Sequence, residues 1–336
     1  MQIIAYGVLA DERNYLESAF NEAFEGAHTL RCLELFLDKD TVPIASGYES
    51  VLTSVNDTLD AEVLGALAAG GTRLIAQRST GYNNIDLRAA GDCGLAVSRV
   101  SYYSPESVAE FAWALALTVN RRIVRAVIRA REFDFRLDGL MGRDFHSRTA
   151  GILGTGKIGT AFARIARGFG MRLLGHDIDK NPECLALGMR YVAPEQLFAE
   201  SDLISLHVPL LPETHHIVNE DALARMKDDA ILVNSSRGGL VDTDALIATL
   251  RAGRLDGVGL DVYEEEAAWF HLDKSLEVMT DDALARLMTF NNVVVTSHQA
   301  FFTQDAVGQI VAATVQNVRD HLDRRSGPNT LVPARG

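Results

Sequence analysis

Short apolar runs alternate with helical patterns through the first hundred residues. Residues 12–24 and 60–70 repeat apolar positions at the three- and four-residue spacing that is typical of amphipathic helices. Runs rich in Ile, Leu and Val predict strands at residues 2–8, 30–35, 72–77 and 95–100. Strands separated by helices form parallel βαβ units with right-handed crossovers, so this part of the chain predicts an α/β domain.

The pattern changes over residues 101–131, which predict one long helix. Ser104 is a plausible N-cap, and Pro105 suits the first helical position, where no backbone donor is needed. From residue 148 onward the strand and helix alternation restarts, and six runs match a complete dinucleotide-binding sheet. These six predicted strands are residues 150–154, 171–177, 202–208, 230–236, 256–262 and 291–297.

A second long helix is predicted at residues 303–322, after the last strand. This helix could carry the chain back to the first domain. The expected fold class is therefore α/β, with two doubly wound parallel-sheet domains, the first of them discontinuous and built from both chain ends.

Composition fits this arrangement and excludes several classes of protein. The chain of 336 residues is long for a single core, and its 47% hydrophobic and 23% charged residues are typical of a globular protein. A net charge of −13 argues against partners such as nucleic acid or anionic membranes. No export signal or membrane span is recognised, and three scattered cysteines predict a reduced, cytoplasmic protein without a metal site.

A glycine-rich turn supplies the clearest chemical signal. Gly154, Gly156 and Gly159 form a GxGxxG pattern that follows a strand-like run and opens a helical one. Glycines at these positions permit a tight turn, close approach of a pyrophosphate and close helix–strand packing. Asp177 ends the next predicted strand, where a carboxylate would bond the ribose hydroxyls and repel the extra phosphate of NADP. The motif therefore favours NAD.

Polar residues follow three of the later strands, at the sheet edge where ligands bind in such folds. They are Arg237, the acidic cluster Glu264, Glu265 and Glu266, and His298. Arginine offers a forked donor pair to a carboxylate, and histidine exchanges a proton near neutral pH. A carboxylate bonded to the second ring nitrogen would orient the histidine. Beside a nicotinamide, the set suits carbonyl reduction.

Each member of this set also has a structural interpretation. Arg237 could cap a sheet edge, three consecutive glutamates are usually a solvated charge run, and a histidine beside β-branched residues is more often part of a core. The spacing alone leaves open which glutamate would pair with the histidine. Four further residues are expected to be structural or near the cofactor rather than catalytic: Asp261, His207, His215 and His216.

Motifs along nearly the whole chain resemble those of the D-isomer-specific 2-hydroxyacid dehydrogenases, and within that family the D-lactate dehydrogenase branch. They occur in the family's order: RSTGYNNIDL, YYSPESVAEF, AGILGTGKIG, LISLHVPLLPETHHIVN, ILVNSSRGGLVD, GLDVYEEE and TSHQAFFT. The resemblance implies a flavodoxin-like substrate domain from residues 1–101 and 300–336, an NAD-binding Rossmann domain from 102–299, and a cleft between them that closes on the ligands.

The resemblance also implies roles for particular residues. Arg237 would bind the substrate carboxylate, His298 would carry the proton, and Glu266 would be the glutamate paired with the histidine. Thr80 and Gly81 would hold the carboxylate through backbone amides, and Tyr103 and Phe301 would line the substrate pocket. The cofactor contacts would be Gly154, Gly156, Lys157, Ile158, Gly159, Asp177, His207, Val208, Pro209, Ser236 and Asp261.

An aromatic ring at Phe301 leaves room for a methyl group more readily than for a long side chain, so reduction of pyruvate to D-lactate is the expected reaction. A bulkier acid, such as a phenyl or branched-chain 2-keto acid, is one alternative. A non-catalytic NAD sensor, similar to the corepressors that share this fold, is another. Relatives assemble through the cofactor domain, so a homodimer or homotetramer is expected.

Overall fold

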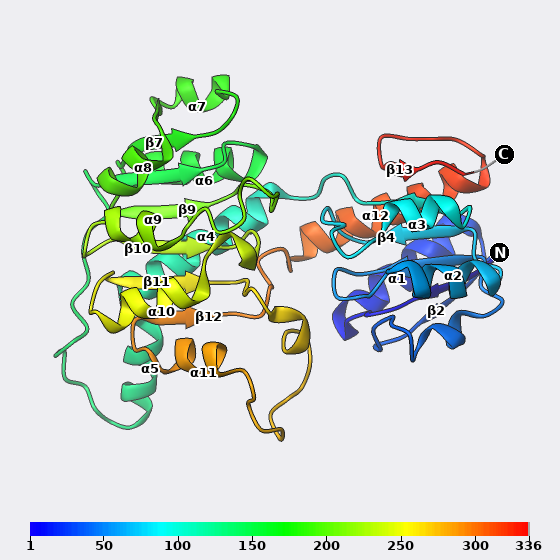
Figure 1. Cartoon of the computed structure of the whole chain (residues 1–336), viewed down its shortest axis with the longest axis horizontal. Helices are drawn as coiled ribbons and strands as arrows, with labels where there is room; N and C mark the ends of the chain where they lie inside the picture. The colour runs from blue at the N-terminus through cyan, green and yellow to red at the C-terminus, as the bar shows by residue number, and fades with distance from the viewer. Residues whose placement is uncertain (335–336) are drawn as a thin grey trace. The chain divides into compact units, whose positions relative to one another are not determined.

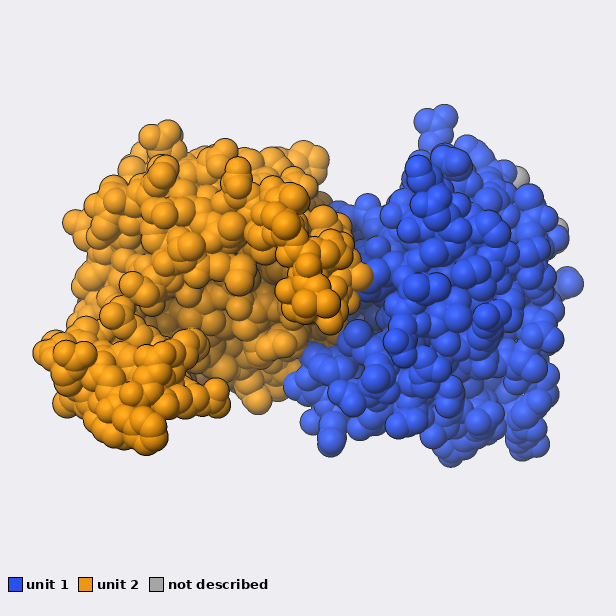
Figure 2. Space-filling view, turned by 90° about the horizontal axis from the view of Figure 1, so that it is seen from below, with its two compact units in different colours: residues 1–104, 302–336 blue, residues 105–301 orange. Residues whose placement is uncertain are grey.

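The computed structural model describes residues 1–334 and divides the chain into two compact units. Unit 1 comprises residues 1–104 and 302–336, and unit 2 comprises residues 105–301. Figure 2 shows the two units in separate colours. The substrate and NAD-binding domains expected from the sequence, with boundaries at residues 102 and 299, stay a prediction. Within residues 1–334, no helix is long and apolar enough to cross a membrane.

Unit 1 is built on a six-stranded sheet in the order β13-β5-β4-β3-β1-β2, in which only β13 is antiparallel to its neighbour. The five parallel strands follow the flavodoxin-like order 2-1-3-4-5. The strands are β1 (Gln2–Ala5), β2 (Thr29–Cys32), β3 (Ser50–Thr53), β4 (Leu74–Gln77), β5 (Ala96–Ser98) and β13 (Thr330–Val332). The sequence pattern predicts four of these strands and misses β3 and β13.

Helices cover both faces of this sheet because successive strand residues point to opposite sides. Ile3 packs with α1 and α12 on one face, whereas Ile4 packs with α2 and α3 on the other. Figure 1 shows α12 running beside the strands of this unit, as expected for residues 303–322. The helices are α1 (Ala10–Phe24), α2 (Ala61–Ala69), α3 (Leu87–Asp92) and α12 (Gln304–Leu322), with a 3₁₀ turn at Val42–Ala45.

Unit 2 contains a seven-stranded, wholly parallel sheet in the order β12-β11-β10-β9-β6-β7-β8. The order corresponds to the doubly wound dinucleotide-binding arrangement with one strand added. The strands are β6 (Thr149–Leu153), β7 (Arg172–His176), β8 (Arg190–Tyr191), β9 (Leu203–Leu206), β10 (Ile231–Asn234), β11 (Gly257–Leu260) and β12 (Val293–Val295). All six predicted strands are present, and the two-residue β8 is the one missed.

Two hydrophobic clusters sandwich this second sheet. One joins the strands to α4, α6 and α7, and the other joins them to α8, α9, α10 and α11. The helices are α4 (Pro105–Asn120), α5 (Ile123–Arg131), α6 (Lys157–Gly168), α7 (Pro182–Ala186), α8 (Pro194–Glu200), α9 (Glu220–Arg225), α10 (Thr243–Arg251) and α11 (Asp282–Thr289), with 3₁₀ turns at Gly238–Leu240 and Glu266–Ala268. The two sheets together confirm the predicted fold class.

The prediction of one long helix over residues 101–131 is wrong. The chain forms α4, which begins at Pro105 as expected, and then the separate helix α5. The break falls at Arg122, whose φ of 52° lies in the left-handed region. No glycine or proline marks this position. The Arg122 guanidinium instead donates to the Val119 carbonyl at 2.6 Å and to Asp256 at 2.6 Å, which ties the break to the end of the sheet.

Candidate active site

The glycine-rich turn joins β6 to α6 in unit 2, and each glycine has a distinct surrounding. Gly154 has a φ of +93°, and a Cβ atom there would lie 2.6 Å from the backbone of His207. A Cβ at Gly159 would overlap the carbonyl oxygen of Gly154. Gly156 is the N-cap of α6, and a Cβ there would meet no atom within 4 Å. Two glycines therefore close the turn, and the third leaves open space at a helix N-terminus, which fits a pyrophosphate.

Asp177 directly follows β7 and faces the same turn. Its Oδ2 accepts hydrogen bonds from the Thr155 backbone amide at 2.6 Å and from Thr155 Oγ1 at 3.1 Å. Its Oδ1 accepts one from the Ile178 amide at 2.7 Å. A carboxylate has about four acceptor positions, so Asp177 retains capacity for ribose hydroxyls. The residues present therefore fit NAD as the bound cofactor.

The loops after β9 and β10 carry further predicted cofactor residues and are linked to each other. Ser236 Oγ donates to the Val208 carbonyl at 2.7 Å, and the His207 amide donates to the Leu153 carbonyl at 2.7 Å. Pro209 is exposed, and its carbonyl accepts from Thr214 Oγ1 at 2.6 Å. These bonds hold both loops beside the end of β6, where the glycine-rich turn begins.

His207 contributes no proton near neutral pH. Burial lowers the pKa of its imidazole to about 3, because the charged form loses its hydration. Its Nε2 lies 2.9 Å from Ser205 Oγ, and its ring lies 5.2 Å from that of Phe162, between centroids. His207 is therefore an uncharged, packed residue, and its contact with the cofactor stays a prediction.

Arg237 follows β10 and lies at the start of a 3₁₀ turn. Its Nη1 donates to the Ser236 carbonyl at 2.6 Å. The next residue, Gly238, lies against the backbone of Tyr263 and Glu264 so closely that a Cβ there would overlap both. This close approach brings the loop that carries Arg237 against the loop after β11. The sequence pattern alone did not reveal the requirement for glycine at this contact.

The three glutamates Glu264, Glu265 and Glu266 have different partners in the structure, whereas their spacing alone left open which of them would pair with His298. Glu266 Oε1 lies 2.6 Å from Nδ1 of His298, and its Oε2 accepts from the Tyr263 amide at 2.9 Å. Glu264 instead contacts His216 at 2.5 Å, and Glu265 is exposed. Only Glu266 therefore occupies the position of an orienting carboxylate, which is the glutamate that the family resemblance selects.

The pair of Glu266 and His298 is mostly shielded from solvent, with side chains 20% and 16% exposed. Burial by itself raises the pKa of Glu266, but the hydrogen bond and charge of His298, the Tyr263 amide and the charge of Arg237 together lower it. Glu266 is therefore ionised at neutral pH and favours the Nδ1–H form of the ring. Because Glu266 is bonded to Nδ1, Nε2 is the ring nitrogen through which His298 would exchange a proton with a substrate.

Asp261 organises the segment that carries His298. It is fully buried at the end of β11, where burial raises the pKa of its carboxyl group against opposing hydrogen bonds from Thr296, Gln299 and Ala300. Its carbonyl also accepts from the amide of His298 at 2.6 Å. These bonds hold His298 at a φ of 53°, a conformation that is uncommon for a residue with a side chain. The sequence pattern did not reveal this positioning role.

The predicted substrate-binding residues are divided between the units. Thr80 and Gly81 belong to a loop after β4 in unit 1, where the Thr80 carbonyl accepts from Arg99 Nη1 at 2.8 Å and the Gly81 carbonyl accepts from Ser79 Oγ at 2.7 Å. Tyr103 is a partly buried residue of unit 1, and Phe301 is a partly buried residue at the end of unit 2. Thr80 and Gly81 both take part in these loop bonds through their carbonyl oxygens.

Comparison with known proteins gives consistent matches over the whole chain. A family model described as D-isomer specific 2-hydroxyacid dehydrogenase, NAD binding domain, matches residues 113–300. The D-lactate dehydrogenase of Escherichia coli (strain K12) is 43% identical over 332 residues, which cover 99% of this chain and 100% of that protein. D-lactate dehydrogenase kk1H of Curvularia clavata is 45% identical over 317 residues, which cover 94% and 91%.

Among solved structures, the pyruvate reductase of Chlamydomonas reinhardtii superposes with a TM-score of 0.92 at 38% sequence identity, covering 98% of each chain. The chain therefore belongs to the D-isomer specific 2-hydroxyacid dehydrogenase family. Residues 113–300 form its NAD-binding domain, and NAD is the cofactor for which the glycine-rich turn and Asp177 are suited.

Proposed function

We propose that this chain is an NAD-dependent D-lactate dehydrogenase that reduces pyruvate. The observation that carries the proposal is the bond between Glu266 and His298 in the same unit as the dinucleotide-binding turn. The D-lactate dehydrogenases at 43% and 45% identity and the pyruvate reductase with the matching fold support lactate and pyruvate as the substrate pair.

The proposed chemistry assigns one task to each group. NADH, when bound, supplies a hydride to the carbonyl carbon. Arg237 binds the substrate carboxylate with its forked donors and polarises the keto oxygen. His298 donates the proton from Nε2 to that oxygen, and takes it back in lactate oxidation. Glu266 holds the ring in the required tautomer and stabilises the charged imidazolium.

The remaining predicted contacts complete the proposed site. Backbone amides of Thr80 and Gly81 would assist Arg237 in holding the carboxylate, and Tyr103 would lie near the substrate. Cofactor contacts would come from Lys157 and Ile158 at the start of α6, together with His207, Val208, Pro209, Ser236 and Asp261. Phe301 would bound the space for the substrate's tail and so favour a methyl group.

The test is to mix the purified chain with NADH and a panel of 2-keto acids and to follow the loss of NADH absorbance. The proposal predicts the highest kcat/KM with pyruvate. A preference for phenylpyruvate or a branched-chain acid would contradict lactate as the product and assign a bulkier 2-hydroxy acid instead. Binding of NADH without turnover of any acid would favour an NAD sensor.

A Phe301→Ala variant sharpens the assignment of the substrate. Each methylene that a pocket accommodates is worth about 10–200-fold in discrimination, so removing the ring should shift the preference toward longer acids by at least about tenfold. Unchanged ratios of kcat/KM across the panel would show that Phe301 does not limit substrate size.

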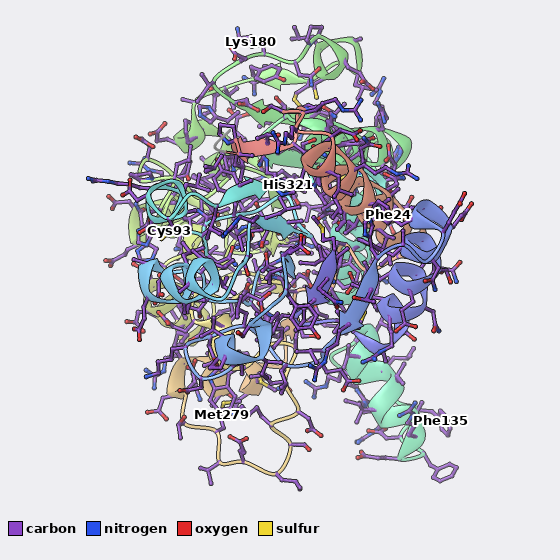
Figure 3. The ribbon with its side chains drawn as sticks, turned by 90° about the vertical axis from the view of Figure 1, so that its right-hand side faces the viewer. Phe24, Cys93, Phe135, Lys180, Met279 and His321 are labelled. Carbon is purple, nitrogen blue, oxygen red and sulfur yellow. The ribbon has the colours of Figure 1, made fainter. Side chains whose placement is uncertain are left out.

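We also propose that the chain forms a homodimer or homotetramer through unit 2. Helix α5 has no buried residue, and Ile123, Val124, Val127 and Ile128 on it are 44–52% exposed. Phe135, which follows this helix, is 72% exposed and points outward in Figure 3. Contiguous exposed apolar residues of this kind are typical of an interface. Light scattering on Val124→Glu and Ile128→Glu variants should show loss of the oligomer, and an oligomer of unchanged size would contradict this interface.

The three cysteines support a cytoplasmic location for the chain. Cys32, Cys93 and Cys184 are all free thiols, as is usual for a protein of a reducing compartment.

A further inference from the structure

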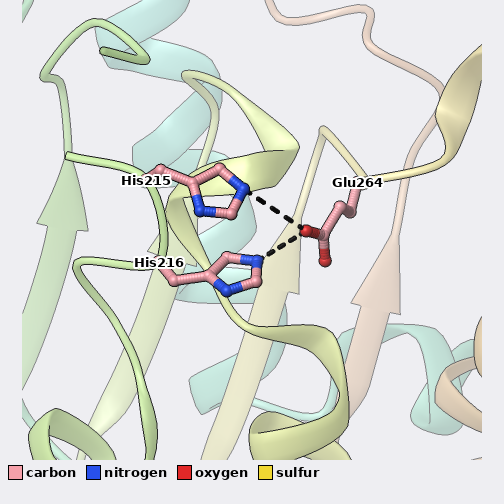
Figure 4. Close-up of side chains that lie close together, drawn as sticks. All are labelled: His215, His216 and Glu264. Carbon is pink, nitrogen blue, oxygen red and sulfur yellow. Dashed lines mark hydrogen bonds and ion pairs between the residues drawn. The ribbon is translucent and has the colours of Figure 1, made fainter. Parts of the chain in front are cut away.

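Two consecutive histidines and a glutamate form a cluster outside the proposed catalytic groups. His215 and His216 lie on the loop between β9 and α9, and Glu264 lies on the loop after β11. Glu264 Oε1 lies 2.5 Å from Nε2 of His216 and 4.0 Å from Nε2 of His215 (Figure 4). One potential ligand atom from each residue lies within 4.8 Å of the other two. Within residues 1–334, this is the one group of three such side chains close enough to share an ion.

The surrounding contacts hold the cluster in place. Thr243 Oγ1 donates to Oε2 of Glu264 at 3.1 Å, which leaves Oε1 directed toward the two rings. The His216 amide donates to the Gly239 carbonyl at 2.9 Å, and the two imidazole rings stack with their centroids 3.9 Å apart. The side chains of His215, His216 and Glu264 are 54%, 32% and 23% exposed, so an ion can reach them from solvent.

The donor set has the chemistry of a transition-metal site. Two imidazole nitrogens and one carboxylate oxygen are common ligands of Zn²⁺, which binds each at about 2.0–2.2 Å in a tetrahedral arrangement. Ligand atoms then lie about 3.3 Å apart. The contact of Glu264 with His216 would have to open from 2.5 Å, and that with His215 would have to close from 4.0 Å. Both changes are within the reach of side-chain rotation, and a water molecule can supply the fourth ligand.

We propose that His215, His216 and Glu264 form a binding site for a divalent transition-metal ion of the Zn²⁺ class. The ion replaces the hydrogen bond between His216 and Glu264 and links the loop after β9 to the loop after β11. It is separate from the proposed catalytic groups, although Glu264 lies two positions before Glu266. Because the ion binds the folded chain and cross-links two loops, it stabilises unit 2 against unfolding.

The test is calorimetric titration of Zn²⁺ into the full chain, prepared without a histidine tag and treated first with a chelator. The wild type should bind one ion per chain. Loss of groups that merely support metal ligands weakens binding by about 10–100-fold, so His215→Ala and Glu264→Gln, which each remove a ligand, should raise the Kd by more than about tenfold. His215 is exposed, so its substitution leaves the fold intact.

Matched controls remove an exposed histidine and an exposed glutamate outside the cluster. His146→Ala and Glu265→Gln should bind Zn²⁺ as the wild type does. The absorption spectrum of bound Co²⁺ gives a second readout, which should show tetrahedral coordination in the wild type and lose it in His215→Ala. Absence of a stoichiometric site in the wild type, or equal affinity in His215→Ala and Glu264→Gln, would overturn the proposal. Neither readout depends on dehydrogenase activity.

Discussion

Two histidines, His207 and His298, follow parallel strands of the same sheet but have different neighbours. His207 directly follows β9 and contacts a neutral hydroxyl, and burial lowers the pKa of its ring to about 3. His298 lies just after β12 and bonds the ionised carboxylate of Glu266. A position at the end of a strand therefore does not determine the surroundings of a histidine. The carboxylate beside His298 comes from a residue 32 positions away.

A variant of Arg237 tests whether this guanidinium binds the substrate carboxylate. Hydrogen bonds to charged groups contribute about 1.5–3 kcal/mol each, and the forked guanidinium offers two. Arg237→Ala should therefore lower kcat/KM for pyruvate by about 10²–10⁴-fold, with an increase in KM and a decrease in kcat. Steady-state kinetics with NADH measure both. A variant with wild-type KM would show that the carboxylate is held elsewhere.

A variant of Glu266 tests the effect of the negative charge that lies beside His298 but not beside His207. Glu266→Gln keeps the size of the side chain but removes the negative charge that favours the imidazolium. We expect kcat to fall by about 10²–10³-fold, approaching the roughly 10⁴-fold loss known for a misoriented catalytic histidine, because the single amide oxygen of glutamine cannot accept from both Nδ1 of His298 and the Tyr263 amide. The neighbouring, exposed Glu265→Gln serves as the control and should retain wild-type kcat. Equal rates in the two variants would remove Glu266 from the mechanism.

His207 is the other member of the comparison, and its replacement should have the smallest effect on turnover. His207→Asn should change kcat by less than about tenfold, because the ring of His207 is uncharged near pH 7 and an uncharged imidazole is a poor acid. A larger loss, with NADH binding intact, would mean that His207 takes part in proton transfer.

The same variant should change the dependence of stability on pH. The folded-state pKa of His207 is about 3, below the unfolded value of 6.5, so between these values the unfolded chain binds a proton that the folded chain does not. The contribution of His207 to the free energy of unfolding is therefore fully present above pH 6.5, and it is lost as the pH falls toward 3. Urea unfolding should show a shallower decrease over this range in His207→Asn than in the wild type.

Local patterns predicted most of the fold. The six longer strands of unit 2, the turn with its three glycines and the helix over residues 304–322 all carry a signal within a short window of sequence. The strand β8 gives no such local signal, because it has only two residues. The break at Arg122 gives none either, because a hydrogen bond to the distant Asp256 stabilises it.

The site required information from more distant residues. Spacing along the chain placed three polar groups at strand ends but left three glutamates equivalent. Folding distinguishes them, because Glu266 meets His298 and Glu264 meets His216. The role of Asp261 has the same origin, since its partners at residues 296–300 lie 35 or more positions along the chain. No periodicity within one element encodes such contacts.

The most direct test of the account is the single-turnover rate of NADH oxidation by His298→Ala with saturating pyruvate, followed by stopped-flow absorbance. This measurement separates the chemical step from product release. General acid catalysis contributes about 10²–10⁴-fold, so the rate should fall by that factor while the NADH Kd, from fluorescence titration, remains within about twofold of the wild-type value, because the variant's binding surface for the cofactor is unchanged. A single-turnover rate near that of the wild type would contradict the assignment of His298 as the proton donor.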